Sequence, residues 1–240
     1  MIVEKEQDII GPDGYEVKYT YDSEGNLLYA DWYVYQGFKG RETYNKKGTI
    51  IQVEGHIFDT GDIFALYNDS GNLLYESRTL LGSKDRETIY TYDERGKLLE
   101  VNTKYTENEI HPSYSNEPDW EKKVYTYDLS GNLYTVEKTE SNGRWDRVTY
   151  NIKGEEMNFD SNYGDWRKTT FDAEGNIYMK EKGFADGKWD RTIYNIKGEK
   201  VSVDTNYGDF ELYFYDEFGN LVRKKTNRED ITYEYIKIAQ

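Results

Sequence analysis

The sequence predicts an all-β protein: an antiparallel meander of about nine tandem β-hairpin repeats that forms an elongated, twisted or curled repeat sheet. Three observations lead to this fold class. Nine glycines recur along the 240 residues at steps of 21 to 35. An aromatic residue stands four positions before each glycine, and Asp or Asn stands three positions before it. No segment shows the sustained apolar spacing of a helix.

Each motif has the chemistry of a hairpin turn. The motif glycines are Gly25, Gly48, Gly71, Gly96, Gly131, Gly154, Gly175, Gly198 and Gly219. In one of them, Asp128 suits the first position of a type I turn, where its carboxylate accepts backbone hydrogen bonds. Gly131 tolerates the left-handed backbone that closes a bulged hairpin. We therefore expect Asp128 to face Asn132. The same arithmetic pairs Tyr21 with Leu27, Tyr92 with Leu98, Phe171 with Ile177, and Tyr215 with Leu221.

A second set of turns alternates with the first. Its glycines lie eleven residues before a motif glycine: Gly14, Gly143, Gly164, Gly187 and Gly208. A turn about every eleven residues, with strands between, gives an antiparallel meander. Apolar residues also stand three positions after each motif glycine, such as Leu28 and Val222, and should face the opposite side of the sheet. Both faces are then apolar, which predicts a sheet that curls over itself or packs on a neighbour.

The spacing of the motifs predicts the domain organisation. We expect an N-terminal lead-in over 1–14 and a single repeat domain over 15–240, interrupted by a loop over 101–120. Two packed lobes are the alternative, because open sheets rarely exceed about ten strands. The segment 143–155 recurs as 187–199, an offset of 44 residues, so two kinds of hairpin alternate.

Composition limits the partners and the compartment. The net charge of −15 argues against nucleic-acid binding and could steer a basic protein partner, although solvation alone also explains it. No stretch approaches the roughly 18 apolar residues of a membrane span. The N-terminus lacks the apolar run of a secretory signal, which predicts a cytoplasmic protein. A secreted or cell-surface protein whose signal peptide had been removed would look the same, so the localisation stays open.

The sequence shows no catalytic or metal site, and we expect a protein that is not an enzyme and needs no cofactor. The two histidines, His56 and His111, are too few and too far apart in sequence for a zinc site. The absence of cysteine excludes thiol catalysis. Acidic residues are abundant, but the recurring Asp residues stand at turn positions with a backbone role.

The candidate binding site is an aromatic–arginine stripe. It comprises Trp145, Arg147, Trp166, Trp189, Arg191 and Phe210. The four aromatic residues recur nine positions before a motif glycine, and the arginines follow Trp145 and Trp189 by two, hence on the same face of a strand. Trp and Arg dominate binding hot spots. The alternative is a structural ladder of cation–π contacts along neighbouring hairpins.

Two repeat families resemble this chain. The segments 19–27 and 125–133 resemble the YD repeats of bacterial Rhs-type proteins, and the spacing from Gly187 through Trp189 to Gly198 is similar to the MORN-variant repeat. Either resemblance covers nearly the whole chain outside 1–14 and 101–120. It implies a non-enzymatic bacterial binding or scaffold protein that recognises another protein, in the manner of an immunity protein or antitoxin. The alternative it implies is a cell-surface carbohydrate-binding or structural YD-repeat module.

Overall fold

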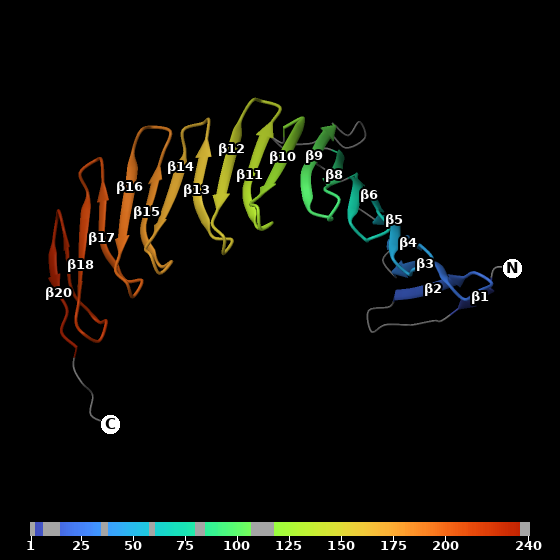
Figure 1. Ribbon diagram of the computed structural model, residues 1–240, viewed down its shortest axis with the longest axis horizontal. Helices are drawn as coiled ribbons and strands as arrows, with labels where there is room; N and C mark the ends of the chain where they lie inside the picture. Colours follow the sequence, from blue (N-terminus) through green and yellow to red (C-terminus); the bar gives the residue numbers. More distant parts are fainter. Residues whose placement is uncertain are drawn as a thin grey trace, which may run out of the picture. The chain divides into compact units, whose positions relative to one another are not determined.

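The computed structural model describes residues 3–6, 15–34, 38–57, 61–79, 85–106 and 118–235. These residues form twenty β-strands and no helix, which confirms the all-β prediction (Figure 1). The chain divides into two compact units. Unit 1 comprises Met1–Val124 and Thr139–Gly143, and unit 2 comprises Tyr125–Lys138 and Arg144–Gln240.

Unit 1 is an antiparallel meander in chain order. Its strands are β1 (Val3–Glu6), β2 (Tyr15–Tyr21), β3 (Leu27–Val34), β4 (Phe38–Tyr44), β5 (Ile50–Ile57), β6 (Gly61–Tyr67), β7 (Leu73–Arg78), β8 (Asp85–Tyr92), β9 (Leu98–Thr106) and the first part of β10 (Trp120–Tyr127). Every strand pairs with the next one along the chain.

Unit 2 follows the same plan. Its strands include β11 (Leu133–Glu140), β12 (Trp145–Tyr150), β13 (Glu156–Ser161), β14 (Trp166–Phe171), β15 (Ile177–Gly183), β16 (Trp189–Tyr194), β17 (Lys200–Thr205), β18 (Phe210–Tyr215), β19 (Leu221–Thr226) and β20 (Asp230–Thr232). From β12 to β20 each strand pairs antiparallel with its successor. Tandem hairpins therefore build both units, as the repeat predicts.

The turns form as their residues predict. All nine motif glycines have φ between 78° and 90°, the left-handed region that glycine enters without steric cost. The backbone N–H of Asp128 donates to the carbonyl of Asn132 at 2.9 Å, and the N–H of Asn132 donates to the Asp128 carboxylate at 2.8 Å. The four predicted cross-strand pairs, from Tyr21–Leu27 to Tyr215–Leu221, are confirmed, each beside a register shift.

The second set of turns is confirmed as well. Gly143, Gly164, Gly187 and Gly208 have φ between 80° and 97°. Gly14 lies outside the described residues. Because both kinds of turn close tight hairpins, the strands between them are short and their register is fixed by the turns.

The bounds of the predicted loop need correction. Residues 101–106 belong to β9 and Trp120 begins β10, so the loop predicted over 101–120 is too long at both ends; residues 107–117 lie outside the described part of the chain. The lead-in over 1–14 contains β1, which pairs with β2 through Val3 and Tyr21. β1 has only four residues and no turn motif beside it, so the repeat pattern does not predict it. The single domain over 15–240 stays a prediction.

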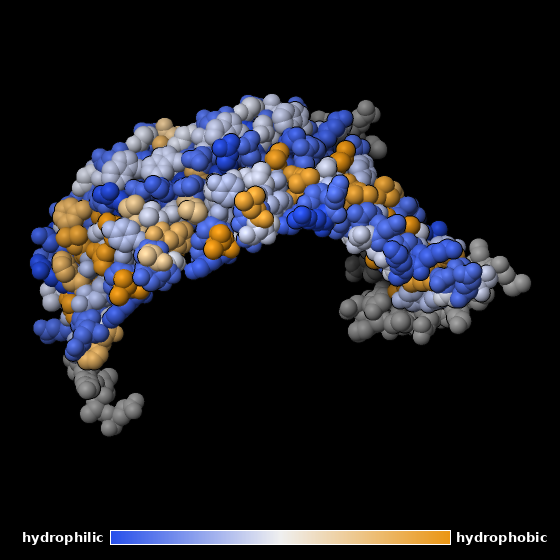
Figure 2. Space-filling view, viewed as in Figure 1, coloured by the Kyte–Doolittle hydropathy of each residue, from blue (hydrophilic) through white to orange (hydrophobic). Residues whose placement is uncertain are grey.

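Each unit is thin. Among the described residues of each unit, strands contact only their neighbours along the chain, so the second layer expected over the apolar faces is not found there. Ala30 and Phe159 are the buried apolar residues of the described chain, and Thr20, Thr88 and Thr103 the buried polar ones. Figure 2 shows hydrophobic side chains interspersed with hydrophilic ones. Stability must therefore come largely from side-chain contacts between neighbouring strands.

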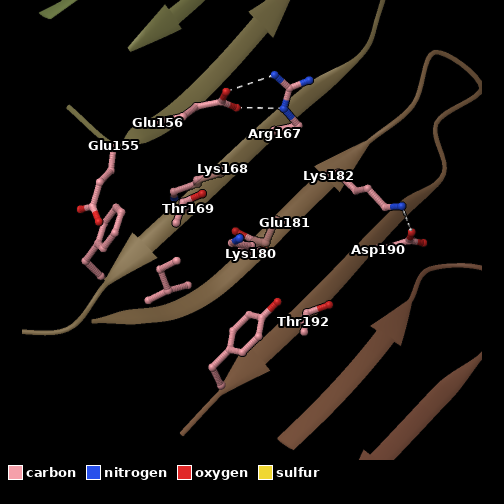
Figure 3. Close-up of a pocket in the computed structure, with 13 residues that line it drawn as sticks. Glu155, Glu156, Arg167, Lys168, Thr169, Lys180, Glu181, Lys182, Asp190 and Thr192 are labelled. Atoms are coloured by element: carbon pink, nitrogen blue, oxygen red, sulfur yellow. Dashed lines mark hydrogen bonds and ion pairs between the residues drawn. The ribbon is translucent and has the colours of Figure 1, made fainter. Parts of the chain in front are cut away.

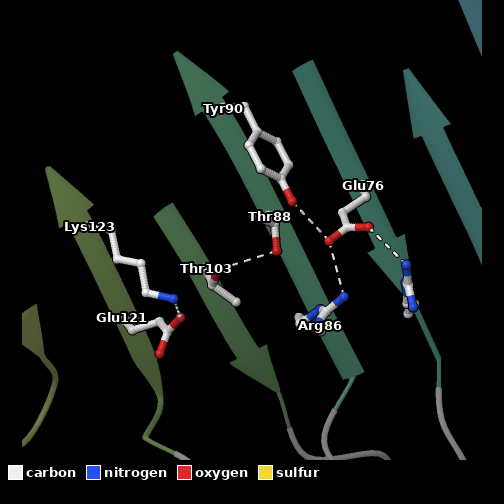
Figure 4. Close-up of polar contacts among 8 residues, drawn as sticks. Glu76, Arg86, Thr88, Tyr90, Thr103, Glu121 and Lys123 are labelled. Carbon is white, nitrogen blue, oxygen red and sulfur yellow. Dashed lines mark hydrogen bonds and ion pairs between the residues drawn. The ribbon is translucent and has the colours of Figure 1, made fainter. Parts of the chain in front are cut away.

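One row of opposed residues crosses unit 1. It runs through Tyr19, Ala30, Glu42, Val53, Ala65, Glu76, Thr88, Thr103 and Glu121. Near its end, the hydroxyls of Thr88 and Thr103 lie 3.2 Å apart, and Glu76 accepts hydrogen bonds from Arg86 and Tyr90, both at 3.0 Å (Figure 4). This row is the most enclosed part of unit 1, because it holds three of the buried residues.

Two tyrosines that donate hydrogen bonds to glutamates, Tyr90 to Glu76 and Tyr213 to Glu211, predict sensitivity to alkali. Burial, helped by a hydrogen bond to a glutamate, raises the pKa of Tyr90 to about 12 and that of Tyr213 to about 12, from 10.0. The folded state therefore holds these phenolic protons more tightly than the unfolded chain does. We expect the free energy of unfolding to be unaffected by these groups below about pH 10 and to fall as the pH rises toward about 12.

Denaturant unfolding at a series of pH values would measure this. The double variant Tyr90→Phe with Tyr213→Phe is the control, because phenylalanine cannot ionise, and it should lose less stability over the same interval. An identical alkaline loss in wild type and double variant would contradict the assignment.

Candidate functional site

The six residues of the aromatic–arginine stripe share one face of unit 2. Its aromatic residues are the first residues of β12, β14, β16 and β18. One cross-strand row joins Arg147, Asp160, Trp166, Gly183 and Trp189. A second joins Arg191, Asp204 and Phe210. Opposed residues point to the same side, as do residues two apart along a strand, so these rows and Trp145 lie on one face.

Hydrogen bonds repeat along this face with the 44-residue offset of the sequence. The backbone N–H of Trp145 donates to the side-chain oxygen of Asn162 at 2.9 Å, and that of Trp189 donates to Asn206 at 2.9 Å. Each asparagine stands in the turn after the following strand. It therefore fixes the start of the strand that carries the tryptophan.

Trp166 has a packing role. A Cβ atom built on Gly183 would lie 2.0 Å from Nε1 and 2.3 Å from Cε2 of Trp166, so the indole covers the glycine of the neighbouring strand. Real Cβ contacts are never that short, and any side chain at Gly183 would displace the ring. The stripe is thus partly a structural contact between β14 and β15.

The two arginines of the stripe are already engaged. Their guanidinium carbons lie 5.8 Å (Arg147 over Trp145) and 5.5 Å (Arg191 over Trp189) from the ring centroids, near the limit of a cation–π contact. Arg147 also donates to Glu137, and Arg191 donates twice to Asp204, at 3.1 and 2.6 Å. The hydrogen bond to Asp204 is the main cause that raises the pKa of Arg191. The stripe therefore offers half-buried rings framed by fixed charges.

The opposite face of unit 2 holds a groove that the sequence did not suggest. Its volume is about 540 Å³, and three adjacent strands, β14, β15 and β16, line most of it (Figure 3). Their opposed residues form three rows. A charged row contains Arg167, Lys182 and Asp190; a middle row contains Thr169, Lys180 and Thr192; an apolar row contains Phe171 and Ile177, with Tyr194 on the third strand.

Two ion pairs lie at the edge of the groove, whereas Lys180 in the middle row is unpaired within the described part of the chain. Arg167 donates to Glu156 at 2.9 Å, and Lys182 lies 2.9 Å from Asp190. The hydrogen bond from Lys182 is the main cause that lowers the pKa of Asp190. The ammonium group of Lys180 has no hydrogen-bond or ion-pair partner among the described residues (Figure 3). An unpaired cation between two hydroxyls is suited to bind an anion.

Possible metal ligands are scattered over the described part of the chain. Among the residues that the structure describes, no three His, Asp or Glu side chains gather as ligands for a metal. His56 Nδ1 lies 2.6 Å from Asp62 Oδ1, an exposed pair, and His111 falls outside the described ranges. The absence of enzymatic activity stays a prediction. No helix in the described part of the chain is long and apolar enough to cross a membrane.

Comparison with known proteins gives only distant structural matches. No family model and no curated protein matches the sequence. Among solved structures, a chain of the Tc holotoxin pore of Photorhabdus luminescens is 13% identical with a TM-score of 0.33, over 92% of this chain and 14% of that one. A chain of the TcdB2–TccC3 complex is 13% identical with a TM-score of 0.33, over 92% of this chain and 15% of that one. A porin-like protein from Bacteroides uniformis is 11% identical with a TM-score of 0.33, over 85% of this chain and 91% of that one.

Matches with a TM-score of 0.33 identify no repeat family, and the resemblance to YD and MORN-variant repeats stays a hypothesis. This chain spans about one seventh of the length of the Tc chains it matches.

Proposed function

We propose that this protein is a non-enzymatic β-repeat module that recognises another protein through the aromatic–arginine stripe of unit 2. The observation that carries the proposal is that the six stripe residues share one face: two cross-strand rows contain five of them, and Trp145 lies two residues before Arg147 on the same strand. Half-buried Trp and Phe rings with fixed arginines between them offer rigid contact area at little entropic cost. An immunity- or antitoxin-like role is the specific form that we propose.

The charge distribution supports a basic partner. The formal charges sum to −11 over unit 1 and −4 over unit 2, which together make the −15 of the chain. Such a field accelerates encounter with a positively charged protein and is screened by salt. We therefore expect association with a basic partner to be faster and tighter at low ionic strength.

The stripe predicts a loss of binding on Trp189→Ala. A pull-down from lysate of the native host at low salt, with the full chain as bait, would identify the partner, and titration with the purified partner would give the dissociation constant. We expect Trp189→Ala to weaken that binding about tenfold or more, as for a hot-spot aromatic residue. Phe218→Ala is the control, because Phe218 is 80% exposed at a turn tip outside the stripe.

Thermal unfolding of the same variants separates the alternatives. A large fall in the midpoint of Trp189→Ala, with affinity unchanged, would assign the stripe to the structural ladder. The absence of any protein partner at low salt would count against the proposed function and favour a carbohydrate-binding or structural module.

A further inference from the structure

The groove on the opposite face of unit 2 exists because one repeat departs from the others. Five of the nine motifs have Asp three positions before the glycine, and we call them Asp-type motifs: those of Gly25, Gly96, Gly131, Gly175 and Gly219. In four of the five, a tyrosine stands two positions before the motif aromatic residue: Tyr19, Tyr90, Tyr125 and Tyr213. At the equivalent position of the fourth Asp-type motif stands Thr169, which lines the groove. A threonine fills far less space than a tyrosine. The groove is therefore placed where the other repeats hold an aromatic ring.

The next Asp-type repeat shows what Lys180 lacks. Lys224 is its equivalent, 44 residues later, and it opposes Tyr213 as Lys180 opposes Thr169. The ammonium of Lys224 lies 2.9 Å from the carboxylate of Glu211 and 5.5 Å from the ring centroid of Tyr213. Arg167 is the equivalent of Glu211, so at Lys180 both the carboxylate and the ring are missing.

We propose that the groove binds a small monocarboxylate that carries an aromatic ring, a site independent of the protein-recognition function above. The ligand supplies the two groups that this repeat has lost. Its ring takes the place of the missing tyrosine, against the apolar row of Phe171, Ile177 and Tyr194. Its carboxylate pairs with Lys180, and the hydroxyls of Thr169 and Thr192, opposed to Lys180 on either side, donate to it.

The charges around the groove favour one negative charge over two. Arg167 and Lys182 are already neutralised by Glu156 and Asp190, and Glu155 also lines the groove, held by a 2.7 Å hydrogen bond from Asn151. Lys168 also borders the groove, but it is one residue away from Thr169 along β14, so its side chain points to the other face of the sheet. Among the described residues, Lys180 is thus the uncompensated cation on the groove side, and a dianion would meet the nearby carboxylates. Pockets of a few hundred Å³ with few convergent polar groups are typical of small-molecule sites.

Titration with phenylacetate, followed by the backbone amide resonances of β14 to β16, tests the site. We expect saturable shifts with a dissociation constant on the order of 1 mM, since the ligand is small and the groove open. Phenylacetamide, which keeps the ring without the charge, and acetate, which keeps the charge without the ring, should each bind about tenfold more weakly. Phenyl phosphate should not bind more tightly than phenylacetate.

Three variants complete the test. Lys180→Gln should weaken phenylacetate binding about tenfold or more, as expected when a charged partner is removed. Thr169→Tyr restores the residue of the other repeats, so it should fold normally and abolish binding by filling the groove. Lys224→Gln, which removes the paired lysine of the next repeat, should bind as wild type does.

Several results would overturn the site. These are unchanged affinity in a folded Thr169→Tyr or Lys180→Gln, equal binding of phenylacetamide, tighter binding of phenyl phosphate, or no saturable shift with phenylacetate up to about 50 mM, well above the expected range. Amide spectra and thermal midpoints of each variant establish that it is folded. None of these readouts involves a protein partner, so the outcome is distinct from that of the pull-down.

Discussion

Replacing Glu76 with alanine is expected to destabilise unit 1 by about 2–4 kcal/mol, the range for removing one partner from a buried charged network. The Glu76 side chain is only 14% exposed, and it accepts hydrogen bonds from Arg86 and Tyr90 at 3.0 Å and from Arg78 at 3.3 Å. Arg78 and Arg86 are directly opposed on β7 and β8. Without Glu76, two neighbouring guanidinium groups repel each other and the Tyr90 hydroxyl loses its acceptor.

The position of Arg86 makes the loss harder to relieve. Its Nε atom is already buried without a partner in the described residues. Rotation of the side chain toward water would break its bond to Glu76 next to the buried Thr88–Thr103 pair, whose members are 3% and 5% exposed. Glu76→Gln should cost less than Glu76→Ala, because an amide oxygen still accepts the bond from Tyr90.

Denaturant unfolding and hydrogen exchange at the amides of β7 to β9 would measure the effect. In a repeat array each hairpin depends on its neighbours, so protection should fall most in those strands. Glu87→Ala is the matched control: Glu87 is exposed on the other side of β8, and its loss should stay within about 0.5 kcal/mol. Equal losses in Glu76→Ala and Glu87→Ala would contradict the importance of the network. The pKa of Tyr90 should also fall toward its ordinary value in Glu76→Ala.

The turns could be predicted from the sequence because their chemistry is local. Asp128 and Gly131 specify a bulged turn without reference to any other part of the chain, and the turn fixes the register of the two strands that it joins. The pairing of Phe171 with Ile177 follows from that alone. The sequence predicts a loop over residues 101–106 because the step from Gly96 to Gly131 is the longest between motifs, whereas pairing with β8 and β10 holds these residues in a strand.

The groove was not predicted because it depends on what is missing. The sequence does show that Thr169 stands where the other Asp-type motifs have a tyrosine. That substitution indicates a groove only once the structure shows that Thr169 and Lys180 oppose each other. It also requires that no further layer covers that face, which holds among the described residues of unit 2. For the stripe, spacing predicted the shared face, but the placement of the Trp166 indole over Gly183 is a matter of side-chain orientation, which spacing does not specify.

Side-chain orientation also gives a glycine outside the turns a role in stability. Gly40 belongs to no turn motif, yet it lies in a cross-strand row between Trp32 and Gly55. A Cβ atom on Gly40 would lie 2.2 Å from the Trp32 ring and 2.6 Å from the backbone oxygen of Glu54. The ring can rotate away, but the carbonyl is fixed by the pairing of β4 with β5.

Gly40→Ala is therefore expected to cost about 3 kcal/mol or more, at the upper end of overpacking effects. Gly48→Ala is the comparison: Gly48 has φ of 78° and nothing within 4 Å of its Cβ position, so alanine there bears only the left-handed backbone cost of about 1–2 kcal/mol. Urea unfolding of both variants measures the difference. Trp32→Ala combined with Gly40→Ala should be less damaging than the two separate losses added together, because the ring clash disappears. If Gly48→Ala destabilises unit 1 more than Gly40→Ala does, the backbone geometry of the turns matters more for stability than the packing of the Trp32 ring over Gly40.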